Sequence, residues 1–247
     1  MDKAIVIGVG PEQGLGSKIC QRLAKEGMHV FIASRDETNI KNLASKIKKN
    51  GGKASAIRTD ATDEKQVVKL FDEVGEELKL AIYNPGNNTP GKIIDMKADY
   101  FSNSWEICCY GGFLFGREAI RRFVPNKVGT LLYTGASASL RGKANFGAFN
   151  SSKAALVQLT KSLAAEWASS GVRVNSLSPG YTRTEMADAP RTREAQPIWT
   201  RDTPMGRMAE VDELRGPAVF LASQALSLIN ISEPTRRYAI WYDVLCL

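Results

Sequence analysis

Short apolar segments rich in β-branched residues alternate with amphipathic segments along most of this chain. Apolar runs of about four to seven residues, bounded by glycine, asparagine or charged residues, predict buried strands. Such runs occupy residues 3–9, 30–33, 54–57, 78–83, 128–134 and 172–177. Between them, apolar residues recur at intervals of three and four, which predicts helices. The expected helices cover residues 15–26, 37–49, 67–74, 100–123, 148–168 and 210–223.

The regular alternation of strand and helix predicts an α/β fold of the Rossmann type. This fold has a doubly wound parallel sheet with helices on both faces. The chain shows no internal repeat and no linker, so we expect one domain over residues 1–225. The final strand of the sheet is expected to be missing, because the sequence after residue 223 does not continue the pattern.

Residues 226–247 differ in character from the rest of the chain. The stretch 226–236 resembles the in-frame translation of a transposase adapter used in sequencing libraries, with a difference at Asn230. We interpret this tail as non-native, and the alternative is a native but divergent C-terminus. The tail is therefore left out of the functional interpretation.

Composition narrows the classes of function. The chain has 247 residues, of which 43% are hydrophobic, so a globular core is expected. His29 is the only histidine and the four cysteines contain no C-x-x-C pair, which argues against a metal site or a thioredoxin-like centre. No apolar run approaches the roughly 20 residues that span a membrane, and the N-terminus lacks a signal-peptide pattern. We therefore expect a cytoplasmic protein without a metal or a membrane partner.

The net charge of +7 favours anionic ligands without indicating nucleic acid. A cluster of lysines lies on one expected helix and the turn after it, with no interleaved aromatic residues for base stacking. Its members are Lys41, Lys46, Lys48, Lys49 and Lys53. A solvated surface is the simpler interpretation, so no nucleic-acid partner is expected.

A cluster of glycines follows the first expected strand, in the sequence Gly-Val-Gly-Pro-Glu-Gln-Gly-Leu-Gly at residues 8–16. Glycine in this position permits a tight turn and a close approach of the backbone to a pyrophosphate, whose charge lies at the N-terminus of the next helix. The alternative is a turn with only a structural role. The location between a strand and a helix favours dinucleotide binding.

Several motifs together resemble those of short-chain dehydrogenase/reductases. Gly10, Gly14 and Gly16 resemble that family's cofactor loop, and Asp60 resembles the acid that holds the adenine. Residues 84–86, Asn-Pro-Gly, resemble the family's N-A-G stretch after the fourth strand. Residues 175–184 are similar to its segment beside the nicotinamide, and the resemblance covers about residues 3–225 in order.

The resemblance implies a set of cofactor-binding residues and a substrate flap over residues 181–209. The implied cofactor-binding residues are Gly10, Gly14, Leu15, Gly16, Ser34, Arg35, Asp60, Ala61, Asn84, Gly86, Lys153, Pro179, Gly180, Thr182 and Thr184.

The end of the second strand bears on the choice of cofactor. An acid at this strand tip would hold the ribose 2′-hydroxyl of NAD, whereas an arginine accepts the 2′-phosphate of NADP. Here the tip carries Ser34 and Arg35, and the acid, Asp36, comes one residue later. NADP is therefore favoured over NAD. The alternative is a surface arginine that pairs with Asp36.

The catalytic positions implied by the resemblance depart from the family's pattern. Its Y-x-x-x-K motif falls on Phe149 and Lys153, so the lysine is present and the tyrosine hydroxyl is missing. The family serine falls on Ala136 with Ser137 next to it, and the family asparagine falls on Cys108. The catalytic set is thus Lys153, Ser137 and Phe149, the last of which cannot act as an acid. Taken alone, Lys153 would be a solvated helix lysine.

Two functions remain open at this stage. Some members of the family resemble this chain over residues 134–142 and also carry phenylalanine before the lysine, which indicates a subgroup of oxidoreductases. Such an enzyme would act on a small carbonyl or alcohol, with Ser137, Tyr110, Tyr181 or water as the proton donor. The alternative is a cofactor-binding protein with little or no turnover. The resemblance also suggests a homo-oligomer, weakened by the altered C-terminus.

Overall fold

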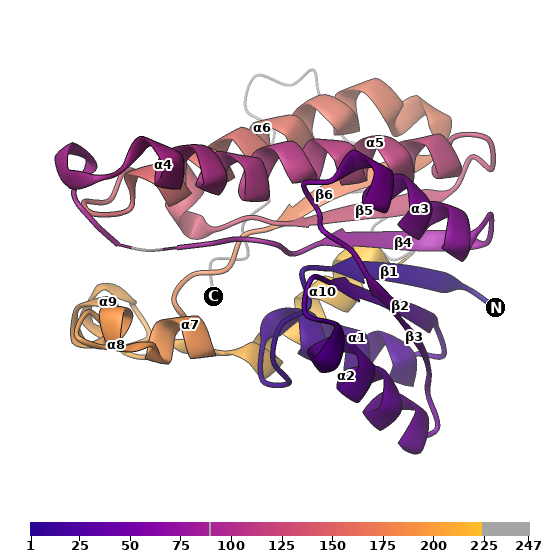
Figure 1. The fold of residues 1–247 in the computed structure, drawn as a ribbon, viewed down its shortest axis with the longest axis horizontal. Coiled ribbons are helices and arrows are strands. Elements are labelled where there is room, and N and C mark those ends of the chain that lie inside the picture. The colour runs from indigo at the N-terminus through magenta and orange to yellow at the C-terminus, as the bar shows by residue number, and fades with distance from the viewer. Residues whose placement is uncertain (89, 224–247) are drawn as a thin grey trace.

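A computed structural model describes residues 1–88 and 90–223 of the protein. Its centre is a parallel six-stranded sheet in the order β3-β2-β1-β4-β5-β6, which confirms the predicted Rossmann-type fold (Figure 1). The order reverses between β1 and β4, so the sheet is doubly wound. The strands are β1 (Lys3–Ile7), β2 (His29–Ser34), β3 (Lys53–Arg58), β4 (Leu78–Tyr83), β5 (Gly129–Thr134) and β6 (Val172–Leu177).

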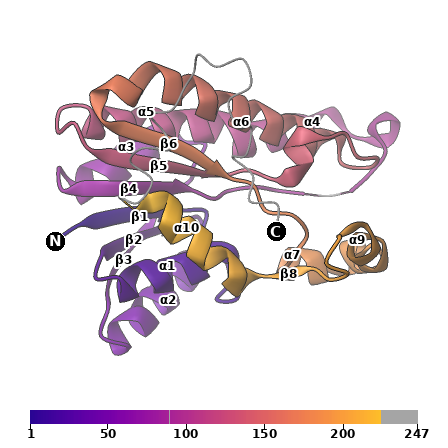
Figure 2. The same ribbon diagram turned by 180° about the vertical axis from the view of Figure 1, so that it is seen from behind.

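Helices cover both faces of the sheet, as Figures 1 and 2 show from opposite sides. One face carries α1 (Leu15–Lys25), α2 (Glu37–Lys49) and α10 (Arg215–Ala222). The other carries α3 (Glu64–Val74), α4 (Ala98–Trp105), α5 (Gly111–Phe123) and α6 (Gly147–Trp167). Each layer has its own apolar core, with Ile19 and Ile40 in the first and Leu70, Phe115 and Leu156 in the second. Because both faces are covered, the central strands β1 and β4 are mostly apolar.

The single helix expected over residues 100–123 is divided by a π-helical turn, Glu106–Tyr110, between α4 and α5. The buried Tyr83 side chain from β4 explains the irregularity, since its hydroxyl donates a hydrogen bond of 2.5 Å to the carbonyl of Ile107. A Cβ at Gly111 would lie only 2.4 Å from the same hydroxyl. A tertiary contact therefore decides the local geometry of this helix. Turns of this kind occur frequently at functional sites.

The expected helix over residues 210–223 is also divided, into a 3-10 turn, Val211–Leu214, and α10. Further 3-10 turns are Ile93–Asp95, Ser137–Leu140 and Ala168–Ser170. None of the helices within residues 1–88 and 90–223 is long and apolar enough to cross a membrane.

The predicted flap follows β6 as a separate group of short elements (Figure 1). They are β7 (Thr182–Arg183), α7 (Glu185–Asp188), α8 (Pro190–Arg193), α9 (Gln196–Asp202) and β8 (Ala209–Glu210). A small apolar cluster of Ala187, Trp199 and Met208 holds them together. The missing final strand and the tail 226–247, which the sequence suggested, lie outside the described residues.

Candidate functional site

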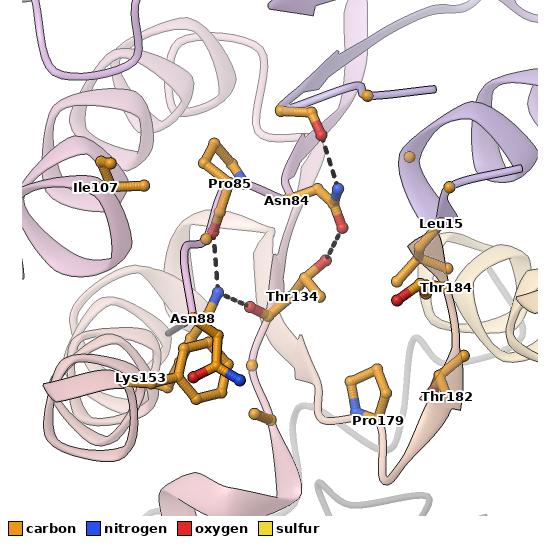
Figure 3. A pocket seen from close by; sticks show the side chains of 18 of the residues that line it. Leu15, Asn84, Pro85, Asn88, Ile107, Thr134, Lys153, Pro179, Thr182 and Thr184 are labelled. Carbon is orange, nitrogen blue, oxygen red and sulfur yellow. Dashed lines mark hydrogen bonds between the residues drawn. The ribbon is translucent and has the colours of Figure 1, made fainter. Parts of the chain in front are cut away.

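A cavity of about 520 Å³ lies where the strands of the large sheet end. In a parallel sheet the carboxyl ends of all strands meet at one edge, and the loops that follow them build the site. All of the predicted cofactor-binding and catalytic residues line this cavity. Figure 3 shows part of the lining, with Leu15 and Thr184 at one end and Lys153 and Ile107 at the other. The structure thus brings the predicted residues together, and their roles stay predictions.

The glycine loop connects β1 to α1. Gly14 is the N-cap of α1, no side chain caps the helix, and its first turn contains no acid. The hydroxyl of Ser17 holds the loop by donating to the carbonyl of Gly10 at 2.9 Å. A Cβ built on Gly10 would meet nothing within 4 Å, so the cavity beside this loop is open. Uncapped backbone N–H groups next to open space suit a pyrophosphate.

The chain makes a close contact at the edge of the cavity, where the loop after β1 meets the loop after β4. Gly8 has a φ of +82°, and a Cβ there would lie 2.4 Å from the backbone nitrogen of Pro85. Glycine is therefore required at this position by both its backbone conformation and the space available.

Asn84 was predicted to bind the cofactor, but its side chain already has protein partners at both ends. Its amide nitrogen donates to the carbonyl of Gly8 at 2.8 Å, and its amide oxygen accepts from Thr134 at 3.0 Å. These bonds tie the ends of β1, β4 and β5 together (Figure 3). Asn84 therefore shapes the cavity wall mainly by positioning the backbone.

Ser34 and Arg35 line the cavity at the end of β2, whereas Asp36 does not. The Asp36 carboxylate caps α2 by accepting from the backbone and side-chain nitrogens of Asn39 at 3.0 and 2.8 Å. Among the contacts of the described residues, Arg35 forms no ion pair with Asp36 or with any other acid. The alternative of an Arg35–Asp36 surface pair is therefore wrong for this structure.

Asp60 and Ala61 follow β3. One carboxylate oxygen of Asp60 accepts from the backbone nitrogen and the hydroxyl of Thr62, at 2.9 and 2.8 Å. These bonds hold the turn at the edge of the cavity that the adenine is expected to occupy.

The segment after β6 forms the opposite wall. The Pro179 carbonyl accepts from the backbone nitrogen of Ser137 at 2.9 Å, and the Thr182 hydroxyl donates to the Gly180 carbonyl at 3.3 Å. The hydroxyl of Thr184 caps α7. This wall is thus held in place by a backbone bond to the segment after β5 and by the hydroxyl groups of its own threonines.

Lys153 lies on α6 and is only 3% exposed. Its ammonium donates to the carbonyls of Thr134 and Pro85, at 2.7 and 3.0 Å (Figure 3). Burial lowers the pKa of this ammonium below its ordinary value. Two of its three protons have protein acceptors, and one is left for a ligand. The alternative of a solvated helix lysine is therefore wrong.

Phe149 lies one helical turn before Lys153, and both line the same end of the cavity. A Cβ built on Gly86 would lie 3.5 Å from the Lys153 ammonium nitrogen and 3.9 Å from the Phe149 ring. The lysine, the ring and the glycine backbone therefore enclose one small space. The ring offers no proton to a ligand in that space.

The structure distinguishes between the hydroxyl groups proposed as proton donors. Ser137 and Tyr181 line the cavity, whereas Tyr110 is not among its lining residues and packs between Trp105 and Phe113. Cys108 is fully buried in the π-helical turn. The geometry therefore retains Ser137 and Tyr181 as candidates.

Asn88 is a cavity residue that the sequence interpretation did not identify. It lines the cavity near Lys153 in Figure 3, and its amide oxygen is buried without a hydrogen-bond partner among the described residues. Its position four residues after Asn84, in a loop that follows a strand, was the only signal available. Arg141 and Lys143, which line the cavity after β5, were missed as well.

Comparison with known sequences gives a match over most of the chain. The family described as Enoyl-(Acyl carrier protein) reductase matches residues 8–233. The NADP-dependent mannitol dehydrogenase of Alternaria alternata is 32% identical over 240 residues, covering 93% of this chain and 88% of the relative.

Solved structures with the same architecture include two that cover nearly the whole chain. A short-chain type dehydrogenase/reductase from Mycobacterium marinum superposes with a TM-score of 0.85 at 32% identity, covering 92% of this chain and 90% of that one. A Beutenbergia cavernae protein, proposed to be an NAD(P)-dependent gluconate 5-dehydrogenase and solved with NADP at low occupancy, gives 0.86 at 29% identity. It covers 92% of both chains.

Proposed function

We propose, because this chain belongs to the short-chain dehydrogenase/reductase family, that it is an NAD(P)-dependent oxidoreductase acting on a small alcohol or carbonyl compound. The observation that carries the proposal is the buried Lys153 ammonium. It is anchored on two backbone carbonyls and retains one proton for a ligand in the cavity. The named activities of the similar proteins, on mannitol and gluconate, support a small hydroxylated substrate.

A nicotinamide dinucleotide, when bound, supplies or accepts the hydride in this chemistry. The chain's own residues fit such a group, since the uncapped N-terminus of α1 suits its pyrophosphate and open space lies beside Gly10. The free guanidinium of Arg35 favours NADP, because no acid lines the tip of β2. Lys153 would hold the ribose next to the nicotinamide.

The reduction of a carbonyl also needs a proton at the oxygen. A tyrosine at position 149 would provide it, and the positive charge of Lys153 would favour the ionised phenol. Phe149 preserves the shape of the site and removes this proton, which we propose as the mark of a subgroup within the family. Ser137, Tyr181 or water would then supply the proton.

The variant Phe149→Tyr tests this interpretation. It adds one hydroxyl beside Lys153 within nearly the same volume. We expect carbonyl reduction to rise by about 10- to 100-fold, the lower part of the roughly 10²–10⁴-fold effect of a general acid. The measurement is kcat/KM for NADPH oxidation with a panel of small ketones and aldehydes. Phe220→Tyr is the matched control, because it adds a hydroxyl to an exposed ring on α10 that does not line the cavity, and it should leave the rate unchanged.

Two other outcomes have distinct meanings. If the unaltered protein reduces its substrate rapidly and Phe149→Tyr slows it, another group is the donor, and Ser137→Ala and Tyr181→Phe are the next variants. If neither protein turns over any carbonyl while both bind NADPH, the alternative of a cofactor-binding protein without turnover replaces the proposal. The observation that favours this alternative is that Phe149 has no hydroxyl group with which to donate a proton.

A further inference from the structure

Two basic side chains line the cavity in the segment between β5 and α6. Arg141 and Lys143 follow the 3-10 turn Ser137–Leu140, on the same segment as the candidate donor Ser137. Among the contacts of the described residues, the Arg141 guanidinium has no hydrogen-bond or ion-pair partner. A cavity-lining guanidinium without a partner has all of its N–H groups available to a ligand.

Lys143 is positioned by the flap. Its ammonium lies 4.4 Å from the centre of the Tyr181 ring, which stacks on Trp199 at 5.1 Å with an interplanar angle of 5°. Phe146 also contacts Trp199, with 6.4 Å between the ring centres. A cation over an aromatic face is held in place without losing its charge. The three rings also give the cavity an apolar wall next to the ammonium.

Negative charge in this region does not balance the positive charge. Asp202 lies 3.8 Å from Lys143 and also pairs with Arg201 at 3.2 Å. The single negative charge of this carboxylate is therefore shared between two positive charges. The acids that line the cavity are Asp60 and Glu185, and neither forms an ion pair with Arg141 or Lys143 among the described contacts. Partial burial lowers the pKa of the Lys143 ammonium; Asp202 opposes this and the nearby Arg141 adds to it. Two like charges kept together in a cavity favour an anionic ligand.

We propose that the substrate of this enzyme carries an anionic group, a carboxylate or a phosphate, that Arg141 and Lys143 bind. Phe146, Tyr181 and Trp199 would cover the carbon chain next to that group. The inference rests on the proposed oxidoreductase function and narrows its substrate class. A planar guanidinium binds either anion through two parallel hydrogen bonds, and the ammonium adds a point charge.

The test compares substrates that differ only in the anionic group. One pair is a short 3-oxo carboxylate and its methyl ester, and the other is dihydroxyacetone phosphate and dihydroxyacetone. With saturating NADPH, we expect kcat/KM to favour the anionic member of one pair by at least about tenfold, the scale of one charge-assisted hydrogen bond. The pair that shows the preference identifies the anion as carboxylate or phosphate. Equal rates for both members of both pairs would overturn the proposal.

Variants assign the preference to the two residues. Arg141→Met and Lys143→Met keep an apolar stem and remove the charge, and each is expected to reduce the ratio of anionic to neutral substrate by about tenfold. Arg141→Lys retains a charge without the planar geometry and should give an intermediate ratio. Lys69→Met, which removes an exposed charge on α3, is the control and leaves the ratio unchanged.

A binding measurement separates failure of this proposal from failure of the proposed function. Calorimetry of the NADPH-loaded protein with a saturated short carboxylate and with inorganic phosphate needs no turnover. If one of them binds, Arg141→Met abolishes the binding and no carbonyl is reduced, the anion site stands and the oxidoreductase function falls. If ketones are reduced without preference and neither anion binds at millimolar concentration, the function stands and the anion site falls.

Discussion

Arg35 and Asp36 are adjacent in the sequence, yet the structure separates their roles. The Asp36 carboxylate is used as the N-cap of α2, so it is directed to the helix and does not line the cavity. Arg35 lines the cavity without an ion-pair partner among the described residues. At the scale of single residues, the helix cap therefore removes the Asp36 carboxylate from the cavity and leaves the Arg35 guanidinium as the charge that a cofactor would contact.

The variant Arg35→Ala should distinguish between the two nicotinamide cofactors. A charge-assisted hydrogen bond contributes about 1.5–3 kcal/mol, so we expect the Kd for NADPH to rise by about 10- to 100-fold. The Kd for NADH should change by less than about twofold, because NADH has no 2′-phosphate. Titration followed by nicotinamide fluorescence measures both.

Arg58→Ala serves as the control for the loss of a nearby positive charge, since Arg58 ends β3 and does not line the cavity. Equal losses of affinity for NADPH and NADH in Arg35→Ala would indicate an effect on the fold and would contradict the role assigned to Arg35.

At the scale of elements, the important unit is β1, its glycine loop and α1. The helix begins at Leu15 without a side-chain cap, so its N-terminal N–H groups are left for solvent or a ligand. Serine, threonine, aspartate and asparagine are preferred at an N-cap, because their side chains accept hydrogen bonds from these N–H groups. The loop thus gives up a small stabilising contact and leaves a site for an anion.

Gly10→Val should block this site without disturbing the fold. A Cβ built on Gly10 meets nothing within 4 Å and Gly10 lines the cavity, so we expect the valine side chain to extend into the cavity. We expect NADPH affinity to fall at least tenfold, while the melting temperature of the free protein shifts by no more than a few degrees. Gly216→Val is the matched control, because Gly216 also has open space around it and lies on α10 away from the cavity. Undiminished NADPH affinity in Gly10→Val would contradict the placement of the pyrophosphate.

At the scale of the whole molecule, α4 and α5 present an exposed row of aromatic side chains. Phe101, Trp105 and Phe113 are 41%, 44% and 41% exposed. Trp105 stacks on Tyr110, which contacts Phe113, so these three rings form a continuous group. Contiguous exposed apolar surface is typical of protein interfaces. The homo-oligomer that the family resemblance suggests would bury this surface against a second copy of the chain.

Light scattering after size-exclusion chromatography tests this surface. We expect at least twice the monomer mass for the unaltered protein and a shift toward the monomer mass when Trp105→Ser and Phe113→Ser are combined. Phe220→Ser is the control, since Phe220 is similarly exposed on α10, which packs on the opposite face of the sheet. A monomeric unaltered protein, or a mass that the double variant leaves unchanged, would contradict this expectation.

The sequence by itself determined the sheet, most helices and the location of the glycine loop. Strands β4 and β6 and helix α2 have the predicted bounds, and most of the other predicted elements differ by one to three residues at either end. These features follow from the spacing of apolar residues and from backbone freedom at glycine, both of which act over a few neighbouring positions. The carboxyl ends of parallel strands then place the loops at one edge.

Only the tertiary structure decided how individual side chains are used at that edge. The π-helical turn depends on Tyr83, which is far from it in the sequence. The two ends of the Asn84 amide find partners at Gly8, just after β1, and at Thr134 on β5. The buried Lys153 ammonium donates to the carbonyls of Pro85 and Thr134, and these hydrogen bonds compensate for its lost hydration. A side chain's desolvation and hydrogen bonds are set by whatever packs against it, and local periodicity contains no information about partners tens of residues away.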